Sequence, residues 1–414
     1  MKTKLALLMG AAMLVAPPAA HAQEAVSGTV DLWVYPIIAD TATHEGFWDG
    51  LIERFNAEYP DVDVRVDIQP WAGRNEKFTA AVSAGRAPDL VYLIPDQIPQ
   101  FVRLGALEPI SLPEEIVADY LPGAVQGATF EGELYTAPVL MSAVAPIYNK
   151  ALFAEAGVET FPETWDELKA IAPSFKDSGA YLLQYNASLE ETLNLTYYPL
   201  LWQAGGRVFA EDGKSVAFNS PEGLKALQFV VDMFKDGYAD PSTISTTLRG
   251  TDAPIAQKRA AMVLSGGSDV VKDMRELWGA DQVGIGEPLT DAEQITYGTV
   301  GGFAMPVNNN DNAAAETFLE FLIQPENLAE FNKISGFFGP RASMGAIHGD
   351  GPFLSQLESY VAIATPGEVH PVARQVISIL APEIQGAILG SKTPDQALAD
   401  AERTANDLIA REGL

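Results

Sequence analysis

Three loop positions in the first quarter of the chain carry side chains suited to holding a polar small molecule. Tyr35 ends a strand predicted at 28–35, Trp71 precedes a predicted helix, and Asp96 follows the apolar run at 90–94. In open α/β sheets, ligands lie beyond the carboxyl ends of the strands. A carboxylate can accept two hydroxyl groups, and an indole face can stack on a ring that presents polarised C–H groups. Alternatively, Asp96 caps a helix and Trp71 covers the edge of a domain.

Polar groups in the middle of the chain would supply mainly hydrogen-bond donors. Ser142 and Asn194 lie between predicted strands, and Gly267 and Ser268 follow the strand predicted at 260–265. Exposed backbone amides in a Gly-Gly-Ser loop can donate to hydroxyl or anionic oxygens. A simple tight turn explains these glycines equally well.

Arg341 is the charged residue that we expect to contact a ligand. A guanidinium can clamp vicinal hydroxyls, a carboxylate or a sulfonate through two parallel hydrogen bonds. Arg74, close to Trp71, is a weaker candidate for the same role, and Gly302 begins the strand predicted at 302–307. An ordinary salt bridge between two parts of the molecule is the alternative for Arg341.

The sequence isolates no catalytic or metal site, and we expect no enzyme activity, metal or cofactor. The Gly-x-Ser-x-Gly elbow of serine hydrolases is absent. The histidines after position 22 are His44, His348 and His370, which have no metal-ligand spacing. The 55 carboxylates keep a secreted carbohydrate-active enzyme open as an alternative.

The N-terminus has the features of a secretory signal peptide at residues 1–22. Lys2 and Lys4 precede an apolar run at 5–16, and the small-residue site at 20–22 ends it. The run has only about 12 residues, whereas a membrane-spanning helix needs about 20. The chain has no cysteine to carry a lipid anchor or a disulfide. We therefore expect a free periplasmic protein without direct membrane insertion.

Length and charge narrow the class of protein further. The 414 residues exceed what one hydrophobic core usually serves, so two or more domains are expected. The formal net charge of −29 makes binding to nucleic acid or anionic lipid unfavourable. Strand patterns at 28–35, 62–68 and 90–94 alternate with helical patterns, which indicates an α/β layer with crossover helices.

Several short segments, in order along nearly the whole chain, resemble the family-1 extracellular solute-binding proteins of ATP-driven (ABC) importers, the group that includes maltose-binding protein. The matching segments are 84–92 (AGRAPDLVY), 132–138 (GELYTAP), 148–150 (YNK), 156–158 (AGV), 164–168 (TWDEL), 260–262 (AAM), 336–341 (GFFGPR) and 393–398 (TPDQAL).

The resemblance implies a two-lobed periplasmic binding protein fold of type II, in which each lobe is a sheet flanked by helices. Lobe 1 would take residues 23–138 plus about 300–335, and lobe 2 would take 139–299 plus about 340–414. Hinge segments would join them near Pro138, Gly301 and Gly336, because glycine absorbs large backbone changes at little steric cost.

The resemblance also implies the ligand and the partners. Asp96 falls where maltose-type relatives place an acidic hydrogen-bonding residue, and a monomer would deliver a small carbohydrate to the membrane permease subunits of an ABC importer. The tryptophan expected after the glycine loop is replaced by Ser268, and 369–380 contains no aromatic residue. A small sugar or sugar derivative is therefore favoured over a long maltodextrin. An anionic sugar or polyol, motivated by Arg341 and Arg74, stays open as an alternative.

Overall fold

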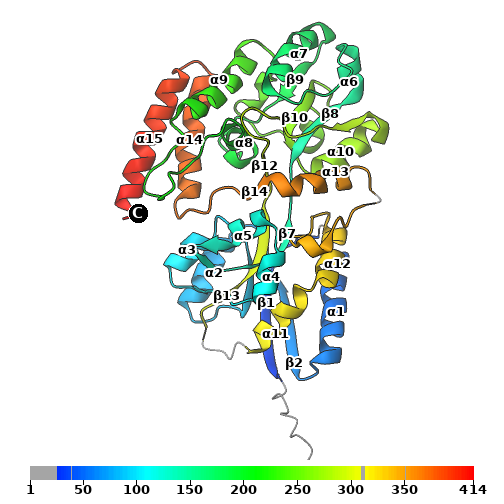
Figure 1. The fold of residues 1–414 in the computed structure, drawn as a ribbon, viewed down its shortest axis with the longest axis vertical. Coiled ribbons are helices and arrows are strands. Elements are labelled where there is room, and N and C mark those ends of the chain that lie inside the picture. The colour runs from blue at the N-terminus through cyan, green and yellow to red at the C-terminus, as the bar shows by residue number, and fades with distance from the viewer. Residues whose placement is uncertain (1–25, 39, 309–312, 350) are drawn as a thin grey trace, which may run out of the picture.

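The computed structural model describes residues 26–38, 40–308, 313–349 and 351–414, which form two α/β lobes stacked along the long axis (Figure 1). The predicted signal peptide at residues 1–22 lies outside the described residues. Two separate sheets, one in each lobe, confirm the predicted fold class. Among the described helices, none is long and apolar enough to cross a membrane.

Lobe 1 is built on a six-stranded sheet with the order β2-β1-β3-β13-β4, in which β7 also pairs with β13. Alternation along β1 buries Val30, Leu32 and Val34 completely, as expected for a strand packed against helices. The strands are β1 (Gly28–Val34), β2 (Val62–Ile68), β3 (Leu90–Leu93), β4 (Leu107–Glu108), β7 (Ala137–Met141) and β13 (Val300–Pro306). A separate hairpin pairs β5 (Thr129–Phe130) with β6 (Glu133–Leu134).

Helices cover the sheet of lobe 1, and the loops that follow its parallel strands lie at one end of it. β1 runs parallel to β2 and β3, so the loops that follow these strands meet at the edge facing lobe 2. The helices are α1 (Thr41–Glu58), α2 (Arg74–Ser83), α3 (Ile98–Arg103), α4 (Glu114–Asp119), α5 (Pro122–Ala128), α11 (Ala313–Leu322) and α12 (Pro325–Ser335).

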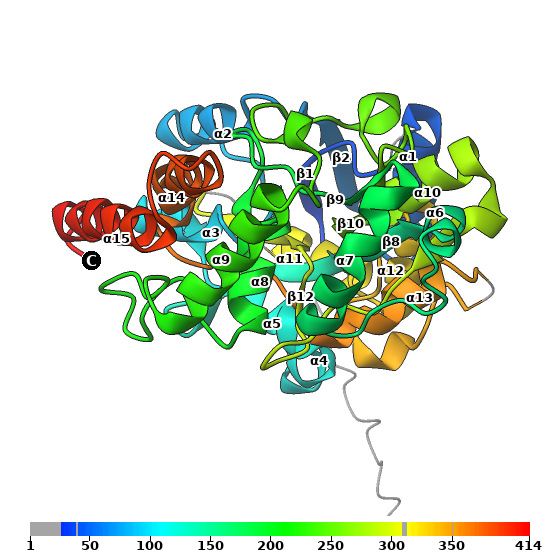
Figure 2. The same ribbon diagram turned by 90° about the horizontal axis from the view of Figure 1, so that it is seen from above.

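Lobe 2 contains a four-stranded sheet with the order β11-β8-β10-β9. Its strands are β8 (Ala145–Asn149), β9 (Tyr181–Gln184), β10 (Ala260–Gly266) and β11 (Val283–Ile285). Its helices are α6 (Lys150–Glu155), α7 (Trp165–Ser178), α8 (Tyr197–Gln203), α9 (Pro221–Lys235), α10 (Ser268–Trp278), α13 (Leu354–Ser359), α14 (Ala373–Ile388) and α15 (Pro394–Arg411). Figure 2, which looks along the long axis, places α14 and α15 on one side of lobe 2 and α10 on the other.

Local sequence signals start the long helices of lobe 2. Thr164 and Glu167 form the predicted capping box of α7, with the Glu167 amide donating to the Thr164 hydroxyl at 3.2 Å. Ser220 caps α9 and Pro221 occupies its first turn. The aromatic cluster of Tyr197, Tyr198 and Trp202 is buried in the core of the lobe. These side chains pack lobe 2 because α8 is buried along its whole length.

Three chain segments cross between the lobes and lie side by side. The first crossing leads from β7 through 142–144 into β8, and the second leads from β12 (Thr296–Tyr297) into β13. The third connects α12 of lobe 1 with α14 of lobe 2 and contains β14 (Ala364–Thr365), which pairs with β12. The Ser142 amide donates to Thr299 O at 2.9 Å, and the Val144 amide donates to Tyr297 O at 3.0 Å. The Gly298 amide donates to Thr365 O at 2.9 Å. The backbone of each crossing is thus hydrogen-bonded to another.

Gly298 allows this close approach. A Cβ atom at this position would lie 2.0 Å from Ser142 O and 2.8 Å from the Ala364 Cβ. Because the first of these atoms is backbone, the crossings themselves would have to separate to make room. We expect Gly298→Ala to lower the free energy of unfolding by about 1–3 kcal/mol, as other overpacking substitutions do. Differential scanning calorimetry measures the effect.

Gly46→Ala provides the matched control for this prediction. Gly46 is exposed within α1, and no atom lies within 4 Å of a Cβ placed there. The control should leave stability unchanged or raise it by up to about 1 kcal/mol, because alanine favours helix. Equal melting temperatures for the two variants would show that the crossings tolerate the added methyl group.

Candidate functional site

A cleft of about 870 Å³ lies between the two lobes. Lobe 1 contributes the loop after β1, including Ile37 and Asp40, and the segment 333–338 at the end of α12. The crossings contribute 142–144 and Tyr297, which form the part of the wall where the lobes join. Lobe 2 contributes Leu195, Ser265 and much of the exposed side of α10. A ligand in this cleft would therefore contact both lobes and the segments that connect them.

Three of the predicted site residues line this cleft. Ser142 lies at the first crossing, and its hydroxyl accepts the Thr299 amide at 3.0 Å. Gly267 is the N-cap of α10 and Ser268 is its first residue, and no side chain caps this helix. The amides of the first turn have no partner within the helix, so they are suited to donating to ligand oxygens.

Trp71 and Tyr35 form an aromatic pair on lobe 1. Their rings stack with centroids 4.8 Å apart and an interplanar angle of 20°. Tyr35 is buried, whereas Trp71 keeps 40 % of its surface exposed. The Arg74 guanidinium lies 5.3 Å from the centre of the Trp71 ring, and its Nε is buried without a hydrogen bond to any described residue. Burial raises the pKa of Tyr35, so its hydroxyl stays neutral.

Asp96 forms an ion pair across the lobes. Its Oδ2 accepts the Nε of Arg374, which lies in the first turn of α14, at 2.6 Å. The other oxygen, Oδ1, is buried and accepts no hydrogen bond from the part of the chain that the structure describes. Asp96 does not cap α3, whose N-cap is Gln97. An unsatisfied buried carboxylate oxygen is costly, which makes Asp96 a strong acceptor for a ligand hydroxyl.

Tyr297 connects this ion pair with the cleft. It lines the cleft from the second crossing, and the charges of Asp96 and Arg374 both act on its hydroxyl group. Burial is the main reason that the pKa of Tyr297 rises to about 12. The tyrosine is therefore a neutral hydrogen-bonding group at the point where lobe 1, lobe 2 and the crossings meet.

Arg341, which was predicted to contact a ligand, lies outside the cleft lining. Its Nε donates to Asp119 Oδ2 at 2.7 Å and its Nη1 donates to Ile323 O at 2.9 Å. Both partners belong to lobe 1, and the Arg341 side chain is only 11 % exposed. The residue makes a salt bridge that fastens the segment after α12 to α4, and it does not line the cleft.

Gly302 and Asn194 are also placed outside the cleft lining. Gly302 lies within β13, where a Cβ would be 2.6 Å from Ala137 O, so close packing of the sheet explains the glycine. Asn194 lies in a short 3₁₀ helix (Leu193–Leu195), and its side-chain amide packs against Gly367. The next residue, Leu195, reaches the cleft instead.

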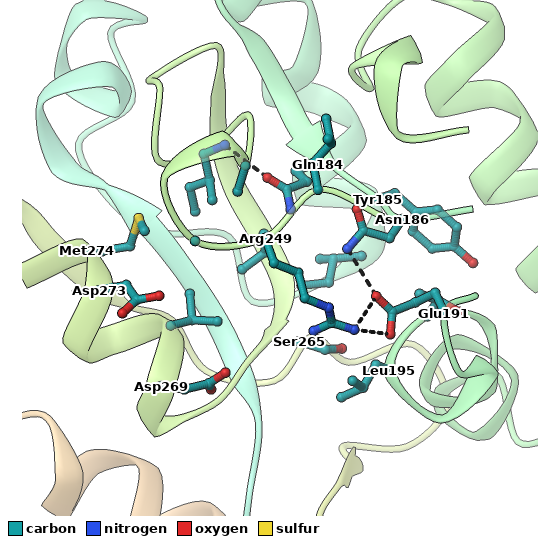
Figure 3. A pocket seen from close by; sticks show the side chains of 18 residues that line it. Gln184, Tyr185, Asn186, Glu191, Leu195, Arg249, Ser265, Asp269, Asp273 and Met274 are labelled. Atoms are coloured by element: carbon teal, nitrogen blue, oxygen red, sulfur yellow. Dashed lines mark hydrogen bonds and ion pairs between the residues drawn. The ribbon is translucent and has the colours of Figure 1, made fainter. Parts of the chain in front are cut away.

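A side pocket of about 160 Å³ extends from the cleft into lobe 2 (Figure 3). The residues shared by cleft and pocket are Leu195, Arg249, Ser265, Asp269 and Val270. Inside it, both oxygens of Glu191 accept Nη2 of Arg249 at 2.9 Å, and Asn186 donates to Glu191 Oε2 at 3.2 Å. Glu191 is 5 % exposed, so loss of Arg249 would leave a buried carboxylate without its cationic partner.

No pattern in the sequence indicates the residues of this pocket or Arg374. Glu191 and Arg249 are 58 positions apart and lie outside any recognisable motif. Arg374 lies at the start of α14 and pairs with Asp96, which is 278 positions away in the sequence. Only the tertiary arrangement brings these charges to the site.

A further cavity of about 500 Å³ contains Glu368, close to the third crossing. The indole Nε1 of Trp202 donates to Glu368 Oε1 at 3.3 Å. Desolvation is the main cause that raises the pKa of Glu368 to about 7, and the Trp202 hydrogen bond opposes it. The carboxyl therefore changes its charge near neutral pH.

A ligand cleft between two α/β lobes that the chain joins through three crossings defines a two-lobed binding protein. Residues 41–329 match the model of the bacterial extracellular solute-binding protein family, and the chain belongs to that family. The resemblance inferred from the sequence is thus confirmed.

Relatives and solved structures agree with this assignment. A Brucella abortus protein named as a binding protein is 26 % identical over 421 residues, covering 99 % of each chain. The diacetylchitobiose binding protein of Streptomyces coelicolor is 28 % identical over 196 residues, which is 46 % of this chain and 43 % of the relative. The cyclic α-maltosyl-1,6-maltose binding protein of Arthrobacter globiformis has the same fold, with a TM-score of 0.82, 24 % identity, and coverage of 93 % of this chain and 99 % of that chain.

The raised pKa of Glu368 predicts a specific pH dependence of stability. The protonated carboxyl is favoured in the folded protein, so its contribution is fully present below pH 4.5 and is lost as the pH rises through about 7. Glu368→Gln stays neutral at every pH. We expect the free energy of unfolding of the variant to match that of the wild type near pH 4.5 and to exceed it above pH 7 by about 3 kcal/mol.

Urea unfolding at several pH values measures this difference. Glu155→Gln, at an exposed position in α6, is the matched control and should change neither the stability nor its pH dependence. If the difference in the free energy of unfolding between the wild type and Glu368→Gln were the same at every pH, the raised pKa of Glu368 would be contradicted.

Proposed function

We propose that this protein captures a small carbohydrate in the cleft between its lobes and delivers it to the membrane permease subunits of an ABC importer. The observation that carries the proposal is the aromatic surface of lobe 1, where Trp71 is exposed beside Arg74 and stacks on Tyr35, two residues before the cleft residue Ile37. An aromatic face next to charged hydrogen-bonding groups suits a sugar ring, which has apolar C–H faces and polar edges. In the cleft, Ser142 supplies a polar group from the first crossing, and Gly267 and Ser268 supply polar groups from lobe 2.

The relatives support a sugar as the solute. One relative is named as a diacetylchitobiose binding protein, and another, from Pyrococcus abyssi, as a maltotriose-binding protein. The anionic alternative depended mainly on Arg341, whose guanidinium is already paired with Asp119. A small neutral or partly cationic sugar is therefore the ligand that we propose. Catalysis is not part of the proposal, since members of this family bind solutes.

In the proposed transport cycle, the two lobes close around the ligand. We assign residues 23–138 and about 300–335 to lobe 1, and 139–299 and about 340–414 to lobe 2. A ligand bound to one lobe would contact the other lobe only in the closed form. It would therefore bind the closed form more tightly than the open form, and this difference in affinity would favour closure. The protein would act as a monomer in the periplasm after its signal peptide is removed.

Calorimetry with a panel of sugars tests the proposal. We expect at least one of glucose, maltose, maltotriose, trehalose, cellobiose and diacetylchitobiose to bind the purified mature protein saturably. Trp71→Ala should weaken that sugar about tenfold or more, through loss of ring stacking. Leu104→Ala, which removes another exposed apolar side chain of lobe 1, is the matched control and should bind normally.

Two results would count against the function. One is the absence of saturable binding for every sugar in the panel. The other is a Trp71→Ala variant that binds the sugar as tightly as the wild type does. This result would show that Trp71 does not contact the ligand.

A further inference from the structure

The side pocket of lobe 2 has an excess of negative charge. Among its lining residues, Glu191, Asp269 and Asp273 are acidic and only Arg249 is basic. Arg249 is engaged by Glu191, so the two aspartates are left without a cation. Neither aspartate makes a hydrogen bond or an ion pair with any residue in the described ranges. A cation entering the pocket would therefore meet two uncompensated carboxylates.

The two aspartates lie on the same face of α10. Asp269 and Asp273 are four residues apart on α10, a spacing that places side chains on the same side of a helix. Figure 3 shows both projecting from α10 toward the pocket, opposite Glu191 and Asn186. Asp269 also lines the cleft, where the basic residues Lys272, Arg275 and Lys333 lie as well, so the excess of negative charge belongs to the pocket and not to the cleft outside it.

A buried amide group points into the same pocket. Gln184 is only 7 % exposed, and its Oε1 accepts the Ile255 amide at 2.9 Å. This bond fixes which end of the amide is the oxygen, so the NH₂ group faces the other way, into the pocket (Figure 3). Nε2 donates to no described residue. An amide donor that faces a pocket and has no protein partner there can donate to an acceptor oxygen of a bound ligand.

We propose that the side pocket receives an amino-sugar end of the solute, with a protonated amine at Asp269 and Asp273 and a ring oxygen or hydroxyl at the Gln184 amide. The inference rests on the proposed function and adds the class of sugar. The ligand needs both an amine and an acceptor oxygen. A plain cation would leave the Gln184 amide without an acceptor, and a neutral sugar would leave the two carboxylates without a cation. An anion would be repelled by the same carboxylates.

Calorimetry with three disaccharides of the same β-1,4 linkage tests the proposal. The free-amine glucosamine disaccharide, its N,N′-diacetyl form and cellobiose differ only in the group at C2 of each of their two rings. At about pH 6 the amine is protonated. We expect the free-amine disaccharide to bind about tenfold more tightly than the other two.

Variants of α10 identify the groups responsible. Asp269→Asn and Asp273→Asn should each remove most of the preference for the free amine while changing cellobiose affinity by less than about twofold. Glu276→Gln, at an exposed position of the same helix, is the matched control and should keep the preference. Thermal melting confirms that each variant is folded.

The outcomes separate this inference from the proposed function. Equal affinity for the three disaccharides, or binding of other sugars but none of these, overturns the amino-sugar assignment and leaves sugar capture standing. Equal weakening of all three ligands by the aspartate variants also overturns it. Failure of every sugar, including the panel above, overturns both proposals together.

Discussion

The hydrogen-bonded contact among the three interlobe crossings is the constraint on which the rest of the structure depends. Each lobe has its own sheet and its own buried core, and the crossings tie the two together through Ser142, Val144 and Gly298. Gly298 has no side chain, which lets two crossings approach to backbone contact. Because the crossings also form part of the cleft wall, any change in the angle between the lobes alters the cleft directly.

The lobes differ in the chemistry that they present. Lobe 1 carries the stacked pair of Trp71 and Tyr35 with Arg74 beside it, outside the residues that line the cleft, whereas lobe 2 places the uncapped start of α10 in the cleft. Asp96 and Arg374 form an ion pair from one lobe to the other. A solute that binds Asp96 would compete with Arg374 or be held between them, so the pair links occupancy of the site to the separation of the lobes.

The sequence predicted the elements well and the charged contacts poorly. Strand alternation and helix caps such as Thr164 depend on neighbouring residues, so they can be predicted locally, and the loops after strands contain Ser142, Gly267 and Ser268, which line the cleft. Arg341 does not line the cleft, because it pairs with Asp119, which lies 222 positions away in the sequence. Arg249 and Glu191 were missed for the same reason. A lone arginine in a sequence does not reveal whether an acidic residue elsewhere already holds it.

Small-angle X-ray scattering tests whether the cleft closes around a sugar. The mature protein would be compared with and without a saturating concentration of the sugar that binds in calorimetry. We expect a decrease in the radius of gyration and in the maximum dimension that follows the binding curve. Identical scattering curves at full occupancy would contradict this expectation.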